Sequence, residues 1–432
     1  MGTAVIGLIL VVTLILLGIP IALSLFVVGF GGIWYLTSFH TASSAIHYTP
    51  LGSLVGSDLA SLPLFMMIGA FALTSGVASA GYKTARTWLG RLPGGLGVAT
   101  IAASAAFCCC SGSSVASAMT MGKLSIKEMQ ENKYDDGLAA GVCGAGGLLA
   151  TMIPPSGAMV LYGLVSGESI SQLLVAGFVP ALIILAGFIG IIVGTALLFP
   201  DKAPLVRQKF SWREKFRSLP NALGIIAIFA TIFIGLFTGA FTPTQAAAWG
   251  ALIALVLLIL KGRAGLWDRF KTACIESAEV NVSILFLMLG AYVFSNFLVI
   301  AGLPQAIQAT VTGLNVAPIL IIIAILLSYV FLGMFLESVT MMLITIPIYY
   351  PIVVGLGFSG IWFGVVVMAM VEIGMLTPPF GIVAFAIKSV APDIDVMRIF
   401  KGVIPFALAE LAVVFLLLAF PQICLWLPSL MK

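Results

Sequence analysis

Apolar stretches of roughly 20 residues, the length an α-helix needs to cross a bilayer, fill most of this chain. Only 8% of its 432 residues are charged, whereas a soluble domain carries about 25%. The sequence therefore predicts an all-α polytopic membrane protein. The first apolar run, residues 2–18, has no basic flank and no small-residue cleavage site. We expect it to be a retained span, with residues 20–36 as a second short span or as the continuation of one tilted helix.

Two apolar stretches are interrupted by adjacent prolines, in TMIPPSG at 151–157 and in TPPFG at 377–381. Proline has no N–H to donate and pushes the preceding residue away from helical geometry. Lipid cannot replace the lost hydrogen bonds. We therefore expect broken transmembrane helices over 137–165 and 359–387. A single break of this kind could be an ordinary proline kink, but the recurrence favours a binding role.

Lysine and arginine gather in short clusters, which are expected to face the cytoplasm. Residues 94–122 lie between the first two clusters and contain SerGlySerSer, which predicts a re-entrant hairpin with its tip at 110–114. No basic residue occurs between Lys271 and Lys388, so a second hairpin, about 315–357 and broken near Glu337, should open from the opposite side. The clusters are at 83–91, 123–133, 202–217, 261–271 and 388–401.

An internal repeat relates the two halves at a nearly constant offset. Residues 1–200 form the first predicted repeat and residues 219–432 the second. A cytoplasmic linker at 201–218 is either an interfacial amphipathic helix or a solvated loop. Each half has an odd number of crossings, so the copies are predicted to be inverted, as in secondary transporters. The matched positions are Pro20 with Pro243, FMMIGAF at 65–71 with FLMLGAY at 286–292, Gly81 with Gly302, Pro154-Pro155 with Pro378-Pro379, and GFVP at 177–180 with GVIP at 402–405.

The polar residues at these interruptions suit ion binding. Freed carbonyls and Ser or Thr hydroxyls can surround a monovalent cation such as Na⁺, and helix N-termini attract an anion. The eight arginines all lie in or beside the predicted cytoplasmic loops, so a substrate carboxylate would meet dipoles, N–H groups and cations instead. Among acids within apolar spans, Glu337 has the strongest claim to a site. Glu372 could serve in the site or in packing, and Glu410 could pair with a partner helix.

Other classes of function lack support. The sequence has no basic surface for nucleic acid. Its six cysteines include Cys108-Cys109-Cys110 but no CxxC pair, and His40 and His47 are its only histidines, so a transition-metal site is not expected. A membrane-embedded hydrolase using Ser113 would need a base, and neither hairpin tip has a nearby histidine or lysine.

Several motifs resemble the large membrane subunit of the tripartite ATP-independent periplasmic (TRAP) transporters, the DctM-like family. The similarity runs from GIPIAL to GVIPFAL. It implies an elevator-type transporter, in which a transport domain holding both hairpins moves against a scaffold. It also implies a small four-helix membrane subunit on a separate chain, a periplasmic substrate-binding protein, and Na⁺-driven uptake of an organic acid anion across a bacterial inner membrane. The motifs are FCCCSGSSVASAMT, ATMIPPSGAMVLYG, FTPTQAAA, FLGMFLESVTMMLITIPIYYPIV and GMLTPPFG.

The same resemblance implies the site residues and at least two Na⁺ ions. Two residues depart from the family pattern, Glu337 in place of an expected aspartate and Gln245 in place of the usual glutamate. The substrate would be a C4-dicarboxylate, sialic acid or a sugar acid. A standalone Na⁺- or H⁺-coupled dicarboxylate or citrate carrier is the alternative. The first Na⁺ site would comprise Ser111, Gly112, Ser113, Pro154, Pro155 and Ser156; the second Glu337, Ser338, Thr340, Thr377, Pro378 and Gly381; and the substrate site Ser114, Ser156, Ser338 and Thr377.

Overall fold

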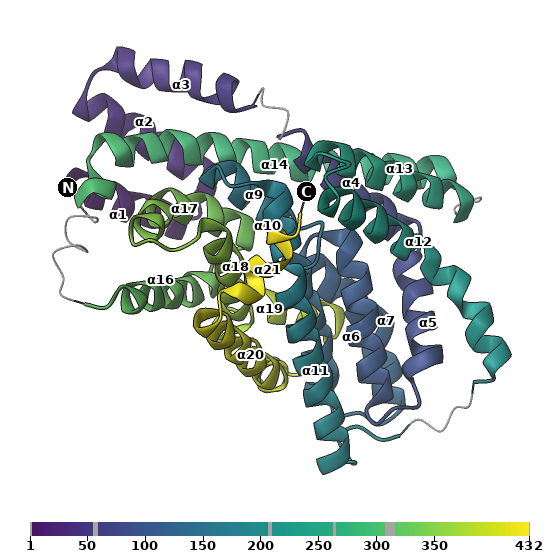
Figure 1. The fold of residues 1–432 in the computed structure, drawn as a ribbon. Coiled ribbons are helices and arrows are strands. Elements are labelled where there is room, and N and C mark those ends of the chain that lie inside the picture. The colour runs from purple at the N-terminus through teal and green to yellow at the C-terminus, as the bar shows by residue number, and fades with distance from the viewer. Residues whose placement is uncertain (1, 55–58, 206–209, 262–264, 307–315, 432) are drawn as a thin grey trace.

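A computed structural model describes residues 2–54, 59–205, 210–261, 265–306 and 316–431 (Figure 1). The regular structure of these residues is helical throughout. Six helices are long and apolar enough to cross a membrane, or seven if a pair bent by 66° counts as one span. The chain is thus a polytopic membrane protein. The helices are α1 (Gly2–Leu16), α2 (Ile21–Leu36), α3 (Phe39–Leu54), α4 (Ser61–Thr74), α5 (Val77–Leu89), α6 (Gly95–Ser111), α7 (Ser114–Glu131), α8 (Asp136–Leu148), η1 (Leu149–Thr151), α9 (Gly157–Ser166), α10 (Ile170–Ala176), α11 (Phe178–Leu198), α12 (Trp212–Phe237), α13 (Pro243–Lys261), α14 (Leu266–Ile300), α16 (Pro318–Gly333), α17 (Ser338–Gly355), α18 (Gly360–Leu376), α19 (Ile382–Val390), α20 (Val396–Ala419) and α21 (Gln422–Ser429).

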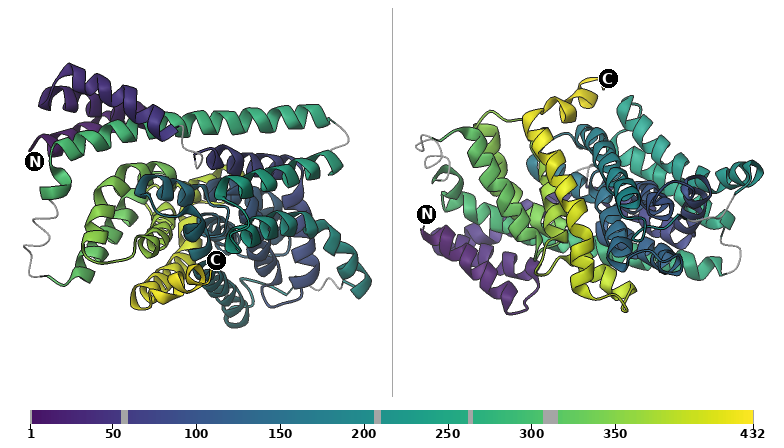
Figure 2. Two further views of the ribbon diagram at one scale, coloured as in Figure 1. Left: turned by 45° about the horizontal axis from the view of Figure 1, so that its top comes forward. Right: turned by 90° about the horizontal axis from the view of Figure 1, so that it is seen from below.

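The 35-residue helix α14 organises one edge of the molecule. It packs against α2 and α4, and α13 packs against α4 in turn. Figure 1 shows this group running along the top of the molecule, and Figure 2 keeps the N-terminal helices at its margin in both further views. The layer thus combines helices from the beginning and the middle of the sequence.

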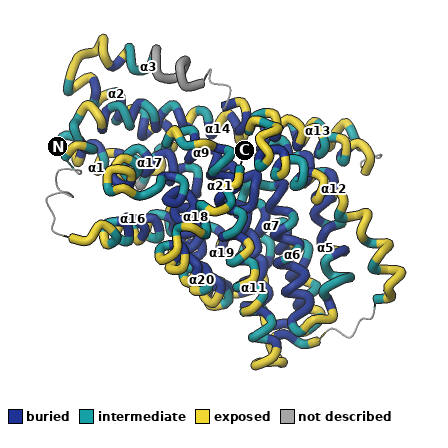
Figure 3. Tube along the Cα trace, in the orientation of Figure 1, coloured by how far each residue is buried: buried dark blue, intermediate teal, exposed yellow. Residues whose placement is uncertain are grey.

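The interior is built from shorter helices of both halves. Helix α8 packs against α7 and α20, and α18 packs against α16 and α20. Burial is greatest along α6, α8 and α18, and Figure 3 shows the buried residues concentrated in this region. Small residues such as those of GVCGAGG at 141–147 let these helices approach closely. The first proline break therefore lies within tightly packed surroundings.

Residues 2–36 form two helices, α1 and α2, which is the first of the two possibilities given for this segment. Helix α3 follows in the less apolar segment 39–54, and α14 begins at Leu266, within the fourth basic cluster. No glycine or proline occurs between Leu266 and Gly290, so nothing in the local sequence ends the helix before its apolar part begins.

The linker between the halves is partly helical. Residues 206–209 lie outside the described part, but α12 begins at Trp212 and continues to Phe237 without a break. Ser211 caps its first turn and Glu214 closes a capping box, which fixes the helix start. Trp88 on α5 donates a 3.2 Å hydrogen bond to the Lys215 carbonyl. The end of the linker is therefore docked on α5. At the second predicted hairpin, residue 315 also lies outside the described part.

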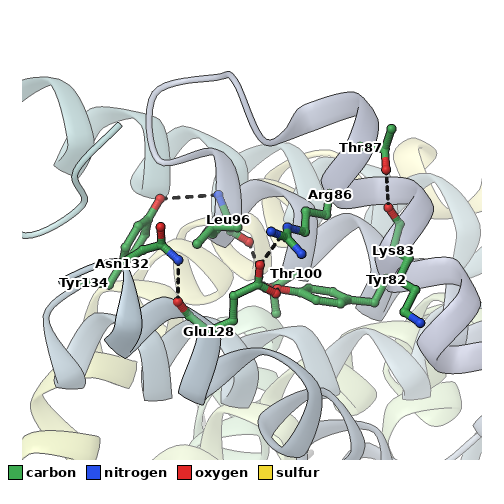
Figure 4. A network of polar contacts seen from close by, with 9 residues as sticks. All are labelled: Tyr82, Lys83, Arg86, Thr87, Leu96, Thr100, Glu128, Asn132 and Tyr134. Carbon is green, nitrogen blue, oxygen red and sulfur yellow. Dashed lines mark hydrogen bonds and ion pairs between the residues drawn. The ribbon is translucent and has the colours of Figure 1, made fainter. Parts of the chain in front are cut away.

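A polar network joins α5 to the second helix of the first hairpin (Figure 4). The Arg86 Nε atom lies 2.6 Å from a Glu128 carboxylate oxygen, and the Tyr82 hydroxyl donates a 2.9 Å hydrogen bond to the other oxygen. Both charged side chains are more than half buried, at 32% and 19% exposed. The contact ties the base of the hairpin to the bent helix pair α4–α5.

Candidate functional site

The first hairpin turns at the SerGlySerSer sequence. Helix α6 ends at Ser111, and Gly112 adopts φ +58°, a left-handed conformation that glycine reaches without steric cost. Ser113 then caps α7 by accepting a hydrogen bond from Ala116 N. The Ser111 and Ser117 hydroxyls are hydrogen-bonded to each other across the turn. The tip therefore exposes the backbone between two helix ends.

The first proline break meets this tip. Helix α8 runs into the 3₁₀ turn η1, and α9 restarts at Gly157 with Ser156 as its cap. A Cβ atom on Gly112 would lie 3.3 Å from the Pro155 carbonyl oxygen, so the two interruptions touch. Residues 149–160 are all buried. This break is enclosed within the protein.

The second hairpin and the second proline break are arranged similarly to the first. Helix α16 ends at Gly333, and Glu337 caps α17 by accepting a hydrogen bond from Val339 N at 3.2 Å. The ring of Phe335 lies 5.1 Å from that of Phe380, which joins this tip to its own break. The Pro378–Pro379 peptide bond is cis, as is Pro154–Pro155. Unlike its counterpart, however, the segment 378–380 is exposed.

One cavity of about 410 Å³ brings the two hairpin tips together. Its walls include Gly112 and Ser113 from the first tip and Glu337, Ser338 and Thr340 from the second. The long helix α14 contributes the rest of the polar lining through Glu279 and Ser283. The two halves thus share one polar cavity at the places where their helices are interrupted.

Three helix N-termini converge on this cavity. Ser113 caps α7, Gly157 is the first residue of α9, and Ser338 is the first of α17. Each N-terminus carries unpaired N–H groups and the positive end of a helix dipole. The cavity can therefore bind anionic groups, while Glu337 and the hydroxyls supply oxygens for cations.

The remaining predicted site residues do not line this cavity. Ser111 and Ser113 line an adjoining cavity of about 210 Å³ beside Glu276. The Thr377 hydroxyl donates to the Ile373 carbonyl at 2.6 Å, one turn back in the helix α18 that Thr377 caps. Of the other predicted residues, Pro154, Pro155, Ser156 and Gly381 are buried and Pro378 is exposed.

Ser114, expected to contact substrate, bonds to an acid of the other half. Its hydroxyl donates a 2.7 Å hydrogen bond to Glu372 Oε1. Glu372 is fully buried, and its second oxygen has no hydrogen-bond partner among the described residues. Glu337 and Glu410 lie near enough to act on it electrostatically. Glu372 therefore belongs to the core behind the tips.

Glu279 and Ser283 are the site residues that sequence reasoning missed. The sequence feature that could have revealed them is a carboxylate and a hydroxyl four positions apart, on one face of an otherwise apolar span. Within the described residues, no group of three His, Cys, Asp or Glu side chains is placed to hold a metal ion. Cation binding here would depend on mixed carboxylate, hydroxyl and carbonyl oxygens.

Comparison with known proteins gives a consistent result. A family model for the DctM component of the tripartite ATP-independent periplasmic transporters matches residues 8–423. The sialic acid TRAP transporter large permease protein SiaM of Vibrio cholerae is 31% identical over 93% of this chain and 95% of its own length. The C4-dicarboxylate large permease protein DctM of Pseudomonas aeruginosa is 29% identical over 86% of each. The ectoine/5-hydroxyectoine large permease protein UehC of Ruegeria pomeroyi is 30% identical over 97% of each.

A solved structure shares the fold. The crystal structure of the Alcanivorax borkumensis YdaH transporter, described as having an unusual topology, superposes with a TM-score of 0.61. The match covers 91% of this chain and 90% of that one at 15% identity, so it concerns the fold alone. The family match and the relatives confirm the resemblance that the SGSS, IPPS and TPP motifs indicated. The chain belongs to the DctM family, the large membrane subunits of TRAP transporters.

Proposed function

We propose that this chain is the large permease subunit of a Na⁺-coupled transporter that takes up a small organic acid anion across a bacterial inner membrane. The cavity shared by the two hairpin tips is the observation that carries the proposal, because three helix N-termini meet there. Anions favour such a site even without an arginine. The substrate would occupy this cavity between Ser113 and Ser338.

The relatives support the substrate class. Three of them are named for sialic acid, C4-dicarboxylate or isethionate transport. Each of these substrates carries an acidic group that helix N-termini and hydroxyls could hold. By the same family membership, the proposed partners are a small membrane subunit and a periplasmic binding protein that delivers the substrate.

Na⁺ would bind at the two tips. At the first, Gly112, which stands between Ser111 and Ser113, lies next to the Pro155 carbonyl, and Pro155 belongs to no helix because it falls between η1 and α9. At the second, the Ser338 hydroxyl lies 3.2 Å from a Glu337 carboxylate oxygen, and Thr340 follows two residues later. Such oxygens suit a hard cation. Bound Na⁺ would raise the positive potential of the cavity and so couple cation binding to anion binding.

During transport, one part of the fold would move against the other. The layer of α2, α4, α13 and α14 would serve as scaffold, and the hairpins and broken helices of two inverted repeats would form the moving part. Glu279 and Ser283 on α14 then face the tips across the boundary between them. An elevator-type displacement would carry the cavity past these α14 side chains.

Reconstitution tests the proposal. Proteoliposomes with this chain, the small membrane subunit and the binding protein should take up labelled organic acid only with an inward Na⁺ gradient. The variants Ser113→Ala and Pro154→Ala should weaken the Na⁺ response, because they remove a hydroxyl and restore a backbone donor, while expression stays near wild type. Ser104→Ala is the control, since this buried serine of α6 lies away from the tip and has no hydrogen-bond partner in the described part. Uptake that persists unchanged without Na⁺ would reject the coupling.

A further inference from the structure

A second polar cavity lies away from the hairpin tips, where α8, α11 and α20 meet. Its volume is about 450 Å³, and it shares no residue with the cavity between the tips. Lys202, Arg398 and Lys401 line it, and these belong to two of the basic clusters that are expected to face the cytoplasm. We call it the basic groove.

The charges in the basic groove favour an anion. Its one acidic lining residue, Asp135, accepts a 3.0 Å hydrogen bond from Leu138 N at the start of α8. Arg398 lies 3.3 Å from Asp136, and its side chain nevertheless stays 65% exposed. Lys202 and Lys401 have no acidic partner within ion-pair distance in the described residues. The groove therefore keeps a surplus of positive charge.

Most of the remaining lining of the groove is apolar. Ile191, Pro405 and Phe406 form a wall between α11 and α20. Phe199 is 56% exposed, and the Lys202 ammonium lies 5.2 Å from its ring centroid. A free phosphate would leave this wall bare, whereas a lipid would cover it with an acyl chain and place its phosphate among the basic groups.

We propose that the basic groove binds an anionic phospholipid. The headgroup phosphate would contact Lys202, Arg398 and Lys401, and one acyl chain would follow the groove between α11 and α20. Basic pockets between transmembrane helices on the cytoplasmic side are suited to such headgroups. The Lys202 carbonyl already accepts a hydrogen bond from Asp135 N at 2.9 Å. A lipid bound there would fasten the segment after α11 to the starts of α8 and α20.

Native mass spectrometry of the purified full chain tests this proposal. Phosphatidylglycerol and phosphatidylcholine with identical acyl chains are compared at equal concentration. We expect phosphatidylglycerol to be retained at least about ten-fold more strongly, because each basic group near the headgroup contributes on the order of 1 kcal/mol. The double variant Lys202→Gln/Lys401→Gln should lose this preference. Lys123→Gln/Lys127→Gln removes two exposed lysines of α7 and should keep it.

Two further measurements distinguish a phospholipid site from a simple anion site. Thr195→Trp should fill the apolar part of the groove and weaken phosphatidylglycerol binding without changing any charge. Equal retention of both lipids, or an undiminished preference in the Lys202→Gln/Lys401→Gln variant, would overturn the proposal. So would competition by inorganic phosphate at millimolar concentration, because it would indicate a simple anion site. Thermal unfolding of each variant shows whether lost binding reflects lost folding.

Discussion

Ser114 on the first hairpin donates a 2.7 Å hydrogen bond to Glu372 on α18, and both residues are buried. The two residues lie 258 positions apart and belong to different halves of the chain. The bond therefore holds the first tip against the helix that leads into the second proline break. A shift of either element would have to break it or carry the other residue along.

Ser114→Ala is expected to lower the free energy of unfolding by about 1–3 kcal/mol, because it removes the hydroxyl that donates to a buried carboxyl. Denaturation in detergent measures this loss. Ser104→Ala is the matched control, another buried serine of the same hairpin, whose hydroxyl has no hydrogen-bond partner in the described part of the chain. Equal losses in the two variants would show that the bond to Glu372 adds no stability.

Glu337→Gln and Glu337→Asp should differ in their Na⁺ response. Aspartate keeps the charge and is a good helix cap, so it should retain Na⁺-dependent uptake. Glutamine keeps the size but loses the charge, and it should raise the Na⁺ concentration for half-maximal uptake several-fold. Uptake assays over a series of Na⁺ concentrations measure this, with Glu131→Gln at the exposed end of α7 as control. If glutamine at 337 leaves the Na⁺ dependence intact, the second cation site does not include this carboxylate.

Gly374→Ala should destabilise the crossing of α16 and α18. A Cβ atom on Gly374 would lie 2.8 Å from Gly333 Cα and 2.8 Å from the Val330 carbonyl oxygen, both backbone atoms. Overpacking of this kind costs about 1–3 kcal/mol. Gly190→Ala on α11 meets nothing within 4 Å, and it should be neutral or stabilise by up to about 1 kcal/mol. Thermal unfolding of the two variants compares them directly, and a stable Gly374→Ala protein would contradict the close approach.

The Arg86–Glu128 contact should appear as a coupling energy. In a double-mutant cycle with alanine at both positions, we expect about 0.5–3 kcal/mol, because the groups are half-buried and the Tyr82 hydroxyl shares the carboxylate. Lys127 and Glu131 are exposed and lie one turn apart on α7. The same cycle on this pair should give a coupling energy of no more than about 0.5 kcal/mol. Chemical denaturation supplies the four stabilities of each cycle. Coupling energies of similar size would mean that burial adds nothing to the Arg86 contact.

Local sequence carried much of the information about where helices end. The prolines at 154–155 and 378–379 and the glycine at 112 act on their own backbone, so their effects can be read without the fold. The family was recognisable from the same motifs, and it is confirmed. The helical state of 39–54 was not predicted, because this segment has neither the apolar content of a span nor clear end signals.

The parts of the site that depend on distant contacts could not be predicted. Glu279 and Ser283 reach the cavity only because α14 passes beside both tips. The Ser114–Glu372 bond depends on how the two halves pack together. One sequence alone contains no spacing rule for such pairs, which lie far apart along the chain and on different helices.

The unequal burial of the two proline breaks has a consequence for access. Residues 149–160 are buried, so a solute held there can leave only through the cavity that Gly157 and Ala158 line or after neighbouring helices separate. Residues 378–380 stand at the outer boundary of the chain and need no such separation. The two proline breaks thus differ in their access to the surroundings, and a small reagent applied to the isolated chain should reach residues 378–380 while leaving residues 149–160 untouched.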